Sequence, residues 1–362
     1  MRAFDTILVT GGAGFIGSNL IRYLLGLPDF HGRIVNLDAL TYAGNLESLA
    51  DVAARFEPRR YSFERADIRD PDAVQAVLAK HRPDAIVHLA AESHVDRSII
   101  GPRDFLETNV LGTFNLLEAA RMTWKDRTDV LFHHVSTDEV YGSLGATGKF
   151  TETTPYDPHS PYSASKAASD HLVLSYFHTY ALPVTLSNCS NNYGPFQFPE
   201  KLLPLMIVNM LEGRNLPVYG DGRNIRDWLY VDDHASAIWR IMTAGVIGEK
   251  YNVGGETEWE NIRLLHELIR VVAMRTGRAP REYERLIEFV TDRPGHDRRY
   301  AIDCTKIKHD LGWSPVYSFA EGLQRTADWY MGNPGWVERV RSGAYREWIE
   351  TNYGSRSAKA DA

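Results

Sequence analysis

The sequence predicts an α/β fold, in which a doubly wound parallel sheet is followed by a smaller, discontinuous C-terminal domain. Through the first half of the chain, short β-rich runs alternate with helical patterns, an order typical of parallel sheets with helices on both faces. A glycine-rich turn joins the first run to the first helical pattern. We predict strands at 7–9, 34–37, 85–89, 130–135 and 183–187, a strand-like run ending before residue 67, and helices at 17–27, 70–80, 108–122 and 164–180.

The alternation ends near residue 188, where loops rich in Pro, Gly and Asn begin. We expect residues 1–188 to form a Rossmann domain, to which the chain returns near 224–235 and 249–254, because 228–231 and 250–253 have the pattern of further strands of the first sheet. Residues 189–223 and 255–330, with short helices at 202–212 and 262–275, are then the second domain. Residues 331–362 are predicted to be a C-terminal helix and a frayed polar tail.

Composition narrows the class of protein. The chain is 44% hydrophobic and 24% charged, which is ordinary for a globular protein. Forty basic and 47 acidic residues give a formal charge of −7, which argues against a nucleic-acid partner. Two cysteines give no disulfide framework, no run is apolar enough for a membrane, and no signal peptide is apparent. We therefore expect a cytoplasmic protein.

The glycine-rich turn has the spacing of a dinucleotide fingerprint. Gly11, Gly14 and Gly17 allow a tight turn, close approach of a pyrophosphate, and close packing of the helix on the sheet. Any strand–helix turn can be glycine-rich, but Asp38 follows Gly17 by 38 − 17 = 21 residues, at the end of the second predicted strand. A carboxylate there favours NAD over NADP. Asp67 and the adjacent Ile68 frame the adenine, or else Asp67 caps a helix; the spacing supports both interpretations equally.

Two pairs of residues suggest the chemistry. Tyr162 and Lys166 lie four apart, so on a helix they share one face, where the ammonium can lower the pKa of the phenol and make it a base. The alternative is an ordinary amphipathic helix. Asp138 and Glu139 follow the strand predicted at 130–135, at the edge where doubly wound sheets bind ligands, although a solvated turn with Asp138 as a cap is the alternative. An acid beside a base is suited to eliminating water.

With these motifs, the chain resembles the extended short-chain dehydrogenases/reductases, and more narrowly the dTDP-glucose 4,6-dehydratases of deoxysugar biosynthesis. The resemblance runs from about residue 6 to about 329, through segments 10–18, 88–98, 136–142, 162–166, 188–195, 199–201, 226–231 and 292–300. Relatives that only epimerise typically carry other residues at 138 and 139, and the GDP-mannose dehydratases have Ser in place of Asp138. The sequence does not depart from the family pattern at the catalytic positions.

The resemblance implies a lyase that carries tightly bound NAD, regenerated in each turnover. Tyr162 would take the proton of the C4 hydroxyl as hydride passes to NAD, and Lys166 would hold the nicotinamide ribose. Glu139 would take the C5 proton and later return one, Asp138 would protonate the departing C6 hydroxyl, and Thr137 would bind the C4 oxygen. The resemblance assigns to the cofactor Gly11, Gly14, Phe15, Ile16, Gly17, Asp38, Thr41, Asp67, Ile68, Ala90, Ala91, Ser93, Thr108, Tyr162, Lys166 and Asn192.

The nucleotide-sugar substrate would lie toward the C-terminal region. The residues assigned to it are Ser93, Thr137, Asn191, Glu200, Lys201, Leu202, Pro217, Tyr219, Arg226, Asn261, Arg293, His296 and Tyr300. Arg226 and Arg293 suit a diphosphate because a guanidinium can bind phosphate through two donors. Surface ion pairs are the alternative for both, a turn residue for His296, and a helix N-cap for Asn261. No metal is expected at this site.

Other hypotheses remain open from the sequence alone. An epimerase, or a dehydratase of another nucleotide sugar, would share most of these motifs, and a catalytically silent NAD-binding protein would share the fold. The resemblance also implies a homodimer, formed through a four-helix bundle of helices at about 101–122 and 162–180 from each subunit.

Overall fold

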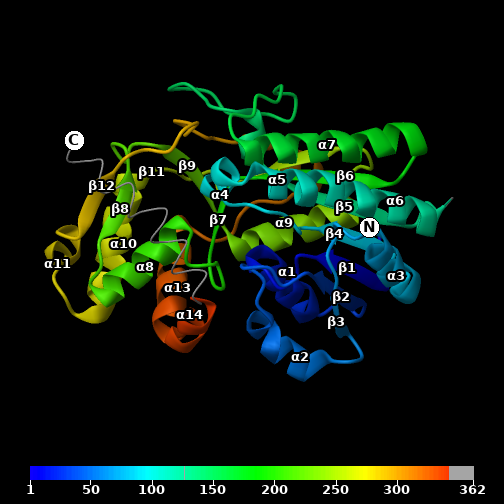
Figure 1. Cartoon of the computed structure of the whole chain (residues 1–362), viewed down its shortest axis with the longest axis horizontal. Coiled ribbons are helices and arrows are strands. Elements are labelled where there is room, and N and C mark those ends of the chain that lie inside the picture. Colours follow the sequence, from blue (N-terminus) through cyan, green and yellow to red (C-terminus); the bar gives the residue numbers. More distant parts are fainter. Residues whose placement is uncertain (126, 342–362) are drawn as a thin grey trace.

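The computed structural model describes residues 1–125 and 127–341. A larger and a smaller region lie side by side, the larger one built on the central sheet (Figure 1). Part of the predicted C-terminal segment, residues 342–362, lies outside the described residues, whereas helix α14 (Pro334–Val340) lies within them.

The larger region contains a sheet of seven parallel strands within the part of the chain that the structure describes, in the order β10-β6-β5-β4-β1-β2-β3. The chain winds outward from β1 through β2 to β3, then returns to the centre at β4 and winds the other way. This arrangement confirms the predicted doubly wound sheet. Its strands are β1 Thr6–Thr10, β2 Arg33–Asp38, β3 Tyr61–Arg65, β4 Ala85–His88, β5 Leu131–Thr137, β6 Val184–Cys189 and β10 Lys250–Val253.

Helices cover both faces of this sheet. Helices α3 (Pro71–His81), α6 (Thr113–Trp124) and α7 (Pro161–Tyr180) bury their apolar side chains on one face. Helices α1 (Phe15–Gly26), α2 (Ala50–Phe56) and α9 (Val231–Ala244) do so on the other. The remaining helical segments of this region are η1 Leu46–Leu49, α4 Val95–Ile100, α5 Pro102–Phe105, η2 Leu106–Gly112, η3 Asp138–Tyr141 and α12 Thr305–Leu311.

Local sequence explains where the important helices begin. The Asp70 carboxylate accepts the N–H groups of Asp72 and Ala73 and so starts α3. Ser160 and Ser163 form a reciprocal capping box at the start of α7. The start of α7 is therefore fixed directly before Tyr162.

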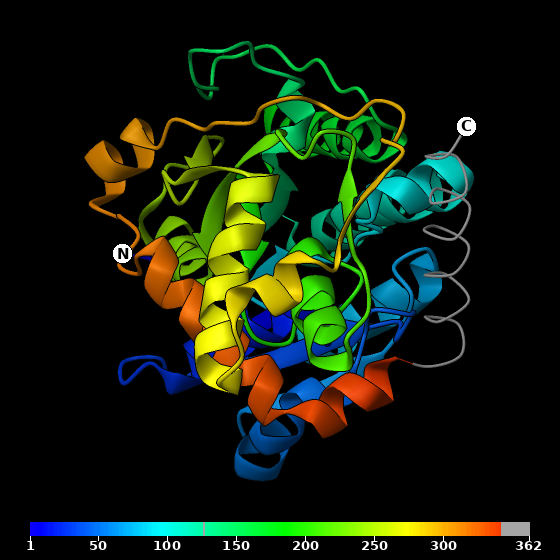
Figure 2. The same cartoon turned by 90° about the vertical axis from the view of Figure 1, so that its left-hand side faces the viewer.

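The smaller region has its own core, toward which Figure 2 looks. Its strands form one sheet in the order β11-β9-β7 and another that pairs β12 with β8, and apolar side chains of α8, α10 and α13 pack against them. The elements are β7 Asn191–Tyr193, α8 Leu202–Glu212, β8 Leu216–Tyr219, β9 Ile225–Tyr230, β11 Glu258–Glu260, α10 Asn261–Thr276, α11 Pro280–Glu284, β12 Ile287–Val290, α13 Phe319–Gly332 and α14.

One predicted strand joins a different sheet. Residues 228–231 were expected in the first sheet, but β9 pairs with β7 and β11, and Trp228 and Tyr230 are buried in the core of the smaller region. The prediction is wrong because a short apolar run does not specify which sheet it joins. The next helix, α9, does return to the larger region beside α1, and β10 pairs with β6 as predicted.

This topology places the carboxyl ends of the central strands against the smaller region. In open α/β sheets, ligands bind at that edge, near the point where the winding direction reverses. No helix among residues 1–125 and 127–341 is long and apolar enough to cross a membrane.

Candidate active site

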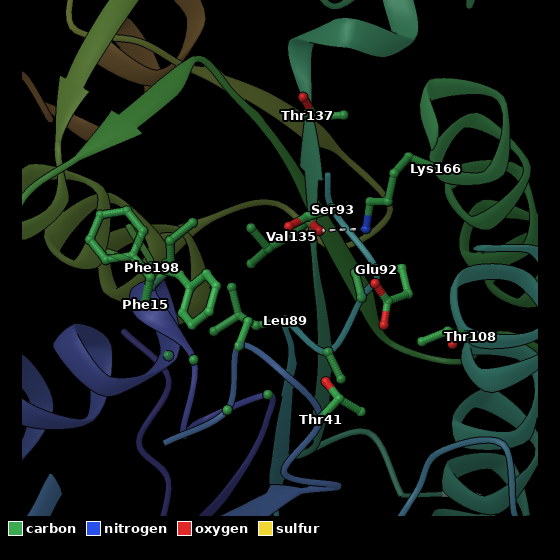
Figure 3. Close-up of a pocket in the computed structure, with 18 of the residues that line it drawn as sticks. Phe15, Thr41, Leu89, Glu92, Ser93, Thr108, Val135, Thr137, Lys166 and Phe198 are labelled. Carbon is green, nitrogen blue, oxygen red and sulfur yellow. Dashed lines mark hydrogen bonds between the residues drawn. The ribbon is translucent and has the colours of Figure 1, made fainter. Parts of the chain in front are cut away.

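A cavity of about 460 Å³ lies at the carboxyl edge of the central sheet. Its walls come from the segments that follow β1, β2, β3, β4, β5 and β6, and from residues 197–201 of the smaller region. Figure 3 shows Thr137 and Lys166 toward one end of this cavity and Thr41 toward the other. A ligand in it would therefore contact both regions of the chain.

The structure brings most of the predicted site residues together here. Every residue predicted for proton transfer and every residue predicted for the cofactor lines the cavity. Of the residues predicted for the substrate, it is lined by Ser93, Thr137, Asn191, Glu200 and Lys201. The others lie outside its walls, namely Leu202, Pro217, Tyr219, Arg226, Asn261, Arg293, His296 and Tyr300.

Several of these outer residues are clustered around Asp96, which is buried in α4. The Tyr219 hydroxyl donates to the Asp96 carboxylate at 3.1 Å, and an Arg293 nitrogen lies 3.9 Å from the same carboxylate. The rings of Tyr219 and His296 meet edge to face. The Arg226 guanidinium lies over the Tyr300 ring at 4.2 Å. Neither arginine is a surface ion pair, because both side chains are largely buried.

Asn261 is the first residue of α10, and its N-cap is Glu260. The N-cap alternative for Asn261 is therefore wrong. Its backbone N–H donates to the carbonyl of Asn224, and its side-chain oxygen is buried with no hydrogen-bond partner among the described residues.

The glycine turn forms a tight cradle for a phosphate. Gly11 has φ of +69°, and a Cβ there would lie 2.8 Å from the backbone of Ala90. A Cβ on Gly17 would lie 2.3 Å from the Gly11 carbonyl oxygen. Phe15 and Ile16 form the first turn of α1, where backbone N–H groups lack intrahelical acceptors, and both line the cavity. These donors fit the pyrophosphate of a dinucleotide such as NAD.

Asp38 fits the ribose of the same dinucleotide. Its carboxylate accepts the N–H of Ala13 at 2.9 Å and that of Leu40 at 2.8 Å, which fixes the side chain at the cavity wall. Burial raises the pKa of Asp38, and these two hydrogen bonds oppose the shift. Asp67 binds the Arg69 guanidinium, and α3 is capped by Asp70, so the capping alternative for Asp67 is wrong.

Tyr162 and Lys166 face the cavity from α7, and both are buried. The Lys166 ammonium donates to the Val135 carbonyl at 2.9 Å (Figure 3). Burial lowers the pKa of Lys166. Burial, with a contribution from Glu139, raises the pKa of Tyr162 well above its ordinary value. This effect outweighs the lowering that the sequence predicted from Lys166, so the phenolate needs further positive charge nearby.

The neighbouring carboxyl groups at the end of β5 have different surroundings. Asp138 is buried, and burial, with Glu139 and Asp227 nearby, raises its pKa well above the usual range. Its Oδ2 has no hydrogen-bond partner among the described residues. Burial also raises the pKa of Glu139, but Arg293 and Arg226 oppose that shift. Of the two carboxyl groups, Asp138 is the one whose surroundings more strongly favour the protonated form. The cap of η3 is Thr137, so the capping alternative for Asp138 is wrong.

Sequence reasoning missed several residues of the cavity wall. Tyr42 and Phe198 meet edge to face, and the Arg97 guanidinium lies 4.0 Å from the centre of the Tyr42 ring. Arg97 also forms an ion pair with Glu200 at 3.1 Å. These contacts join segments that are far apart in the sequence, and no local spacing signals them.

A fingerprint turn, a buried carboxylate at the end of β2 and a tyrosine–lysine pair in one cavity define an NAD-dependent enzyme of the extended short-chain dehydrogenase/reductase class. Residues 8–326 match the family model described as GDP-mannose 4,6 dehydratase. The curated relatives are more specific, and through them the chain belongs to the dTDP-glucose 4,6-dehydratase family.

The dTDP-glucose 4,6-dehydratase of Shigella flexneri is 54% identical, over 97% of this chain and 99% of that protein. A Bacillus anthracis dTDP-glucose 4,6-dehydratase solved with NAD is 44% identical, with a TM-score of 0.81 over 92% of this chain and 99% of that one. A Streptomyces venezuelae dTDP-glucose 4,6-dehydratase solved with NAD and dTDP is 46% identical, with a TM-score of 0.83 over the same shares.

Proposed function

We propose that this chain removes water from dTDP-glucose to give dTDP-4-keto-6-deoxyglucose. The observation that carries the proposal is the pair Asp138 and Glu139, whose surroundings differ although both share a cavity with Tyr162 and Lys166. Oxidation alone requires one base, whereas elimination also requires an acid that holds its proton. An epimerase has no use for that acid.

Tyr162 and Lys166 begin the reaction at the C4 carbinol of the sugar. NAD supplies a cationic ring that accepts the C4 hydride and later returns it to C6. Tyr162 takes the proton of the C4 hydroxyl, which leaves a ketone at C4. Lys166 contributes positive charge that favours the phenolate. The Thr137 hydroxyl, at the end of β5, binds the C4 oxygen.

Glu139 and Asp138 then act on neighbouring carbons. The C4 ketone acidifies the C5 proton, and Glu139 removes it as a base. Asp138 gives its proton to the C6 hydroxyl, which departs as water. Glu139 returns a proton to C5 when hydride reaches C6. Asp138 thus acts in the protonated form that its surroundings favour, whereas at Glu139 the charges of Arg293 and Arg226 oppose the rise in pKa that burial causes.

The nucleotide half of the substrate is proposed to reach the cluster around Asp96. Arg226 and Arg293 both lie close enough to Glu139 to act on its charge, so a diphosphate bound between them would hold the sugar near the carboxyl pair. Lys201 and Ser93 both line the cavity, and the Lys201 ammonium donates to the Ser93 carbonyl at 2.9 Å. These contacts support the proposal that the cluster around Asp96 and the segment that contains Lys201 both bind the substrate.

The test is incubation with dTDP-, UDP-, CDP- and GDP-sugars, followed by mass spectrometry. We expect dTDP-glucose to lose one water with no external NAD, and the product to absorb in alkali as a 4-keto sugar. Conversion of the sugar to an isomer of unchanged mass would instead indicate an epimerase. No reaction with any sugar, although NAD is bound, would indicate a silent NAD-binding protein.

We also propose a homodimer in a reducing cytoplasm, where its two free cysteines, both buried, would stay reduced. Helices α6 and α7 contact each other along one flank of the molecule. Several large apolar side chains on this flank are exposed, namely Ile100, Leu106, Leu111, Phe114, Met122 and Tyr180. A second copy that supplies the same helices would cover them in a four-helix bundle. Light scattering should report a dimer at micromolar concentration, and a monomer would contradict this proposal.

A further inference from the structure

Helix α7 carries a third ionisable residue in line with Tyr162 and Lys166. Asp170 follows Lys166 by four residues, as Lys166 follows Tyr162, so the three side chains form one stripe of the helix. Unlike the other two, Asp170 does not line the cavity, and it is fully buried behind Lys166. A buried carboxylate is costly unless it is paired, so its partners indicate its role.

Three neutral donors converge on one oxygen of Asp170. Its Oδ2 accepts hydrogen bonds from the Ser136 hydroxyl at 2.9 Å, the Tyr156 hydroxyl at 2.8 Å and the Asn188 amide at 3.2 Å. Hydrogen bonds to the ionised form favour that form. They oppose burial, which by itself raises the pKa of Asp170.

The other oxygen of Asp170 faces Lys166 across His134. Asp170 Oδ1 lies 3.3 Å from Nε2 of His134, and Lys166 Nζ lies 3.4 Å from the same nitrogen. Both His134 and Asp170 are fully buried. Burial and the nearby ammonium hold the pKa of His134 well below its usual value, so its ring is neutral. Nε2 of His134 thus lies within 3.4 Å of both charged groups.

We propose that Asp170 is the buried counter-ion that keeps Lys166 charged and in place beside Tyr162, with the neutral ring of His134 between them. Asp170 is then a positioning residue, since it acts on the reaction through Lys166 and touches neither substrate nor cofactor. The inference rests on the proposed roles of Tyr162 and Lys166, and it extends their pair to a line of three.

The physical reason is the cost of burying an ammonium group. Burial lowers the pKa of Lys166 and so favours its neutral form. Among the nearby groups that raise this pKa, Asp170 has the largest effect. A neutral amine would no longer favour the Tyr162 phenolate, which burial already makes costly. Without Asp170, a smaller fraction of Tyr162 is therefore expected to be ionised at neutral pH.

Other titratable groups face Lys166 or Asp170 from β4, β5, β6, β10, η3 and the segment between η3 and α7. They are His88, His134, Tyr141, Glu152, Tyr156, Cys189 and Lys250. Burial keeps the histidines neutral, and it keeps the Cys189 thiol protonated by raising its pKa to about 12. Lys250 lies over the ring of Tyr156, whose hydroxyl donates to Asp170. None of these groups replaces Asp170 as the anion behind Lys166.

The first test titrates the Tyr162 phenolate by ultraviolet absorbance in the NAD-loaded enzyme. Subtracting the titration of Tyr162→Phe isolates this phenol from the other tyrosines. We expect Asp170→Asn to raise the pKa of Tyr162 by about one unit or more, which is about a tenfold loss of phenolate at a given pH below the pKa. Asp170→Glu, which retains the charge, should recover most of the loss.

Tyr156→Phe is the matched control. It removes one hydrogen bond from Asp170 but leaves the carboxylate and two of its donors. If the role of Asp170 were only to hold this part of the fold together, Tyr156→Phe would raise the pKa of the Tyr162 phenol as Asp170→Asn does. We expect it to leave the phenol pKa unchanged.

A comparison of the stabilities of a single and a double variant tests the proposal even if Asp170→Asn folds poorly. Removing one partner of a buried pair leaves an uncompensated charge, whereas removing both does not. We therefore expect the urea midpoint of Lys166→Met/Asp170→Asn to exceed that of Asp170→Asn. A double variant no more stable than that single one would overturn the proposal, as would an unchanged or lowered Tyr162 pKa in Asp170→Asn. Neither readout uses a sugar, so the assigned substrate can fail without affecting this test.

Discussion

Asp138 and Glu139 are consecutive in the chain, yet different sets of charged side chains act on their carboxyl groups. Asp138 is buried beside Asp227, and its Oδ2 has no hydrogen-bond partner within residues 1–125 and 127–341, whereas Arg293 acts on Glu139 and Arg226 acts on both carboxyl groups. The turn of η3 directs the two side chains to these different places, and the Thr137 hydroxyl accepts the Glu139 N–H at 3.2 Å to hold that turn. We propose that an acid and a base are made in this way from two similar residues.

The first prediction separates oxidation from elimination. Asp138→Asn and Glu139→Gln should still reduce bound NAD when dTDP-glucose is added, because Tyr162 and Lys166 are intact. Dehydration should fall by about 10²- to 10⁴-fold, the usual effect of losing a general acid or base. Absorbance at the NADH band and mass spectrometry would follow the two steps. Tyr162→Phe is the control that should form neither NADH nor product, and near wild-type dehydration by both carboxyl variants would refute the assignment.

The second prediction concerns pH. Asp138 must hold its proton to act as the acid, and burial raises its pKa, so dehydration should decline as pH rises through that raised value. Glu139 must be ionised, and its pKa is also raised, so dehydration should decline as pH falls through that value. In Asp138→Asn the alkaline limb should disappear from the profile of the residual rate. An alkaline limb that persists unchanged in this variant would assign it to another group.

The third prediction concerns cofactor choice. Asp38→Asn keeps an oxygen that can accept a backbone N–H but loses the negative charge at the proposed ribose site. A hydrogen bond to a charged group contributes about 1.5–3 kcal/mol, so NAD affinity should fall by roughly 10- to 150-fold. Affinity for NADP should fall less, because repulsion of its 2′-phosphate is removed. Calorimetry on the NAD-depleted protein measures both, and an unchanged ratio of the two affinities would exclude this role.

The fourth prediction tests the glycine cradle. A methyl group on Gly17 would meet the Gly11 carbonyl oxygen at 2.3 Å and Gly12 Cα at 2.6 Å, and these backbone atoms cannot move aside cheaply. Gly17→Ala should therefore lower both thermal stability and NAD retention. Gly26→Ala is the matched control on the same helix, where an added Cβ meets nothing within 4 Å. The control should retain NAD, and equal behaviour of the two variants would refute the cradle.

The residues predicted for the cofactor all line the cavity, and there is a physical reason for this. The glycine turn, Asp38 and the segment 136–139 each follow a strand directly, so their positions depend on a few neighbouring residues and on strand order. The tyrosine–lysine pair depends only on helical spacing. These features are local, and a parallel sheet brings the carboxyl ends of its strands together.

The parts that were missed depend on contacts between distant segments. Nothing in residues 228–231 distinguishes a strand of the larger sheet from one of the smaller sheet. Tyr42 and Phe198 meet through loops that are 156 residues apart (198 − 42). Asp96, which Tyr219 and Arg293 contact in the structure, was not singled out from the sequence. Asp170 could have been noticed, because it continues the spacing of four.

The last prediction concerns nucleotide choice. Tyr219 lies on β8 with its hydroxyl held by Asp96 and its ring against His296, next to the two arginines proposed for the diphosphate. We expect the base to lie beside this ring, in a pocket that distinguishes thymine from uracil by one methyl group. Such a group contributes roughly 1–3 kcal/mol, so kcat/KM for dTDP-glucose should exceed that for UDP-glucose by about 10- to 200-fold. Purine sugars should be inactive, because a larger base does not fit a pyrimidine pocket. Competition kinetics with both sugars in one reaction measures the ratio directly, and equal specificity constants would leave the dehydratase assignment standing while excluding thymine recognition here.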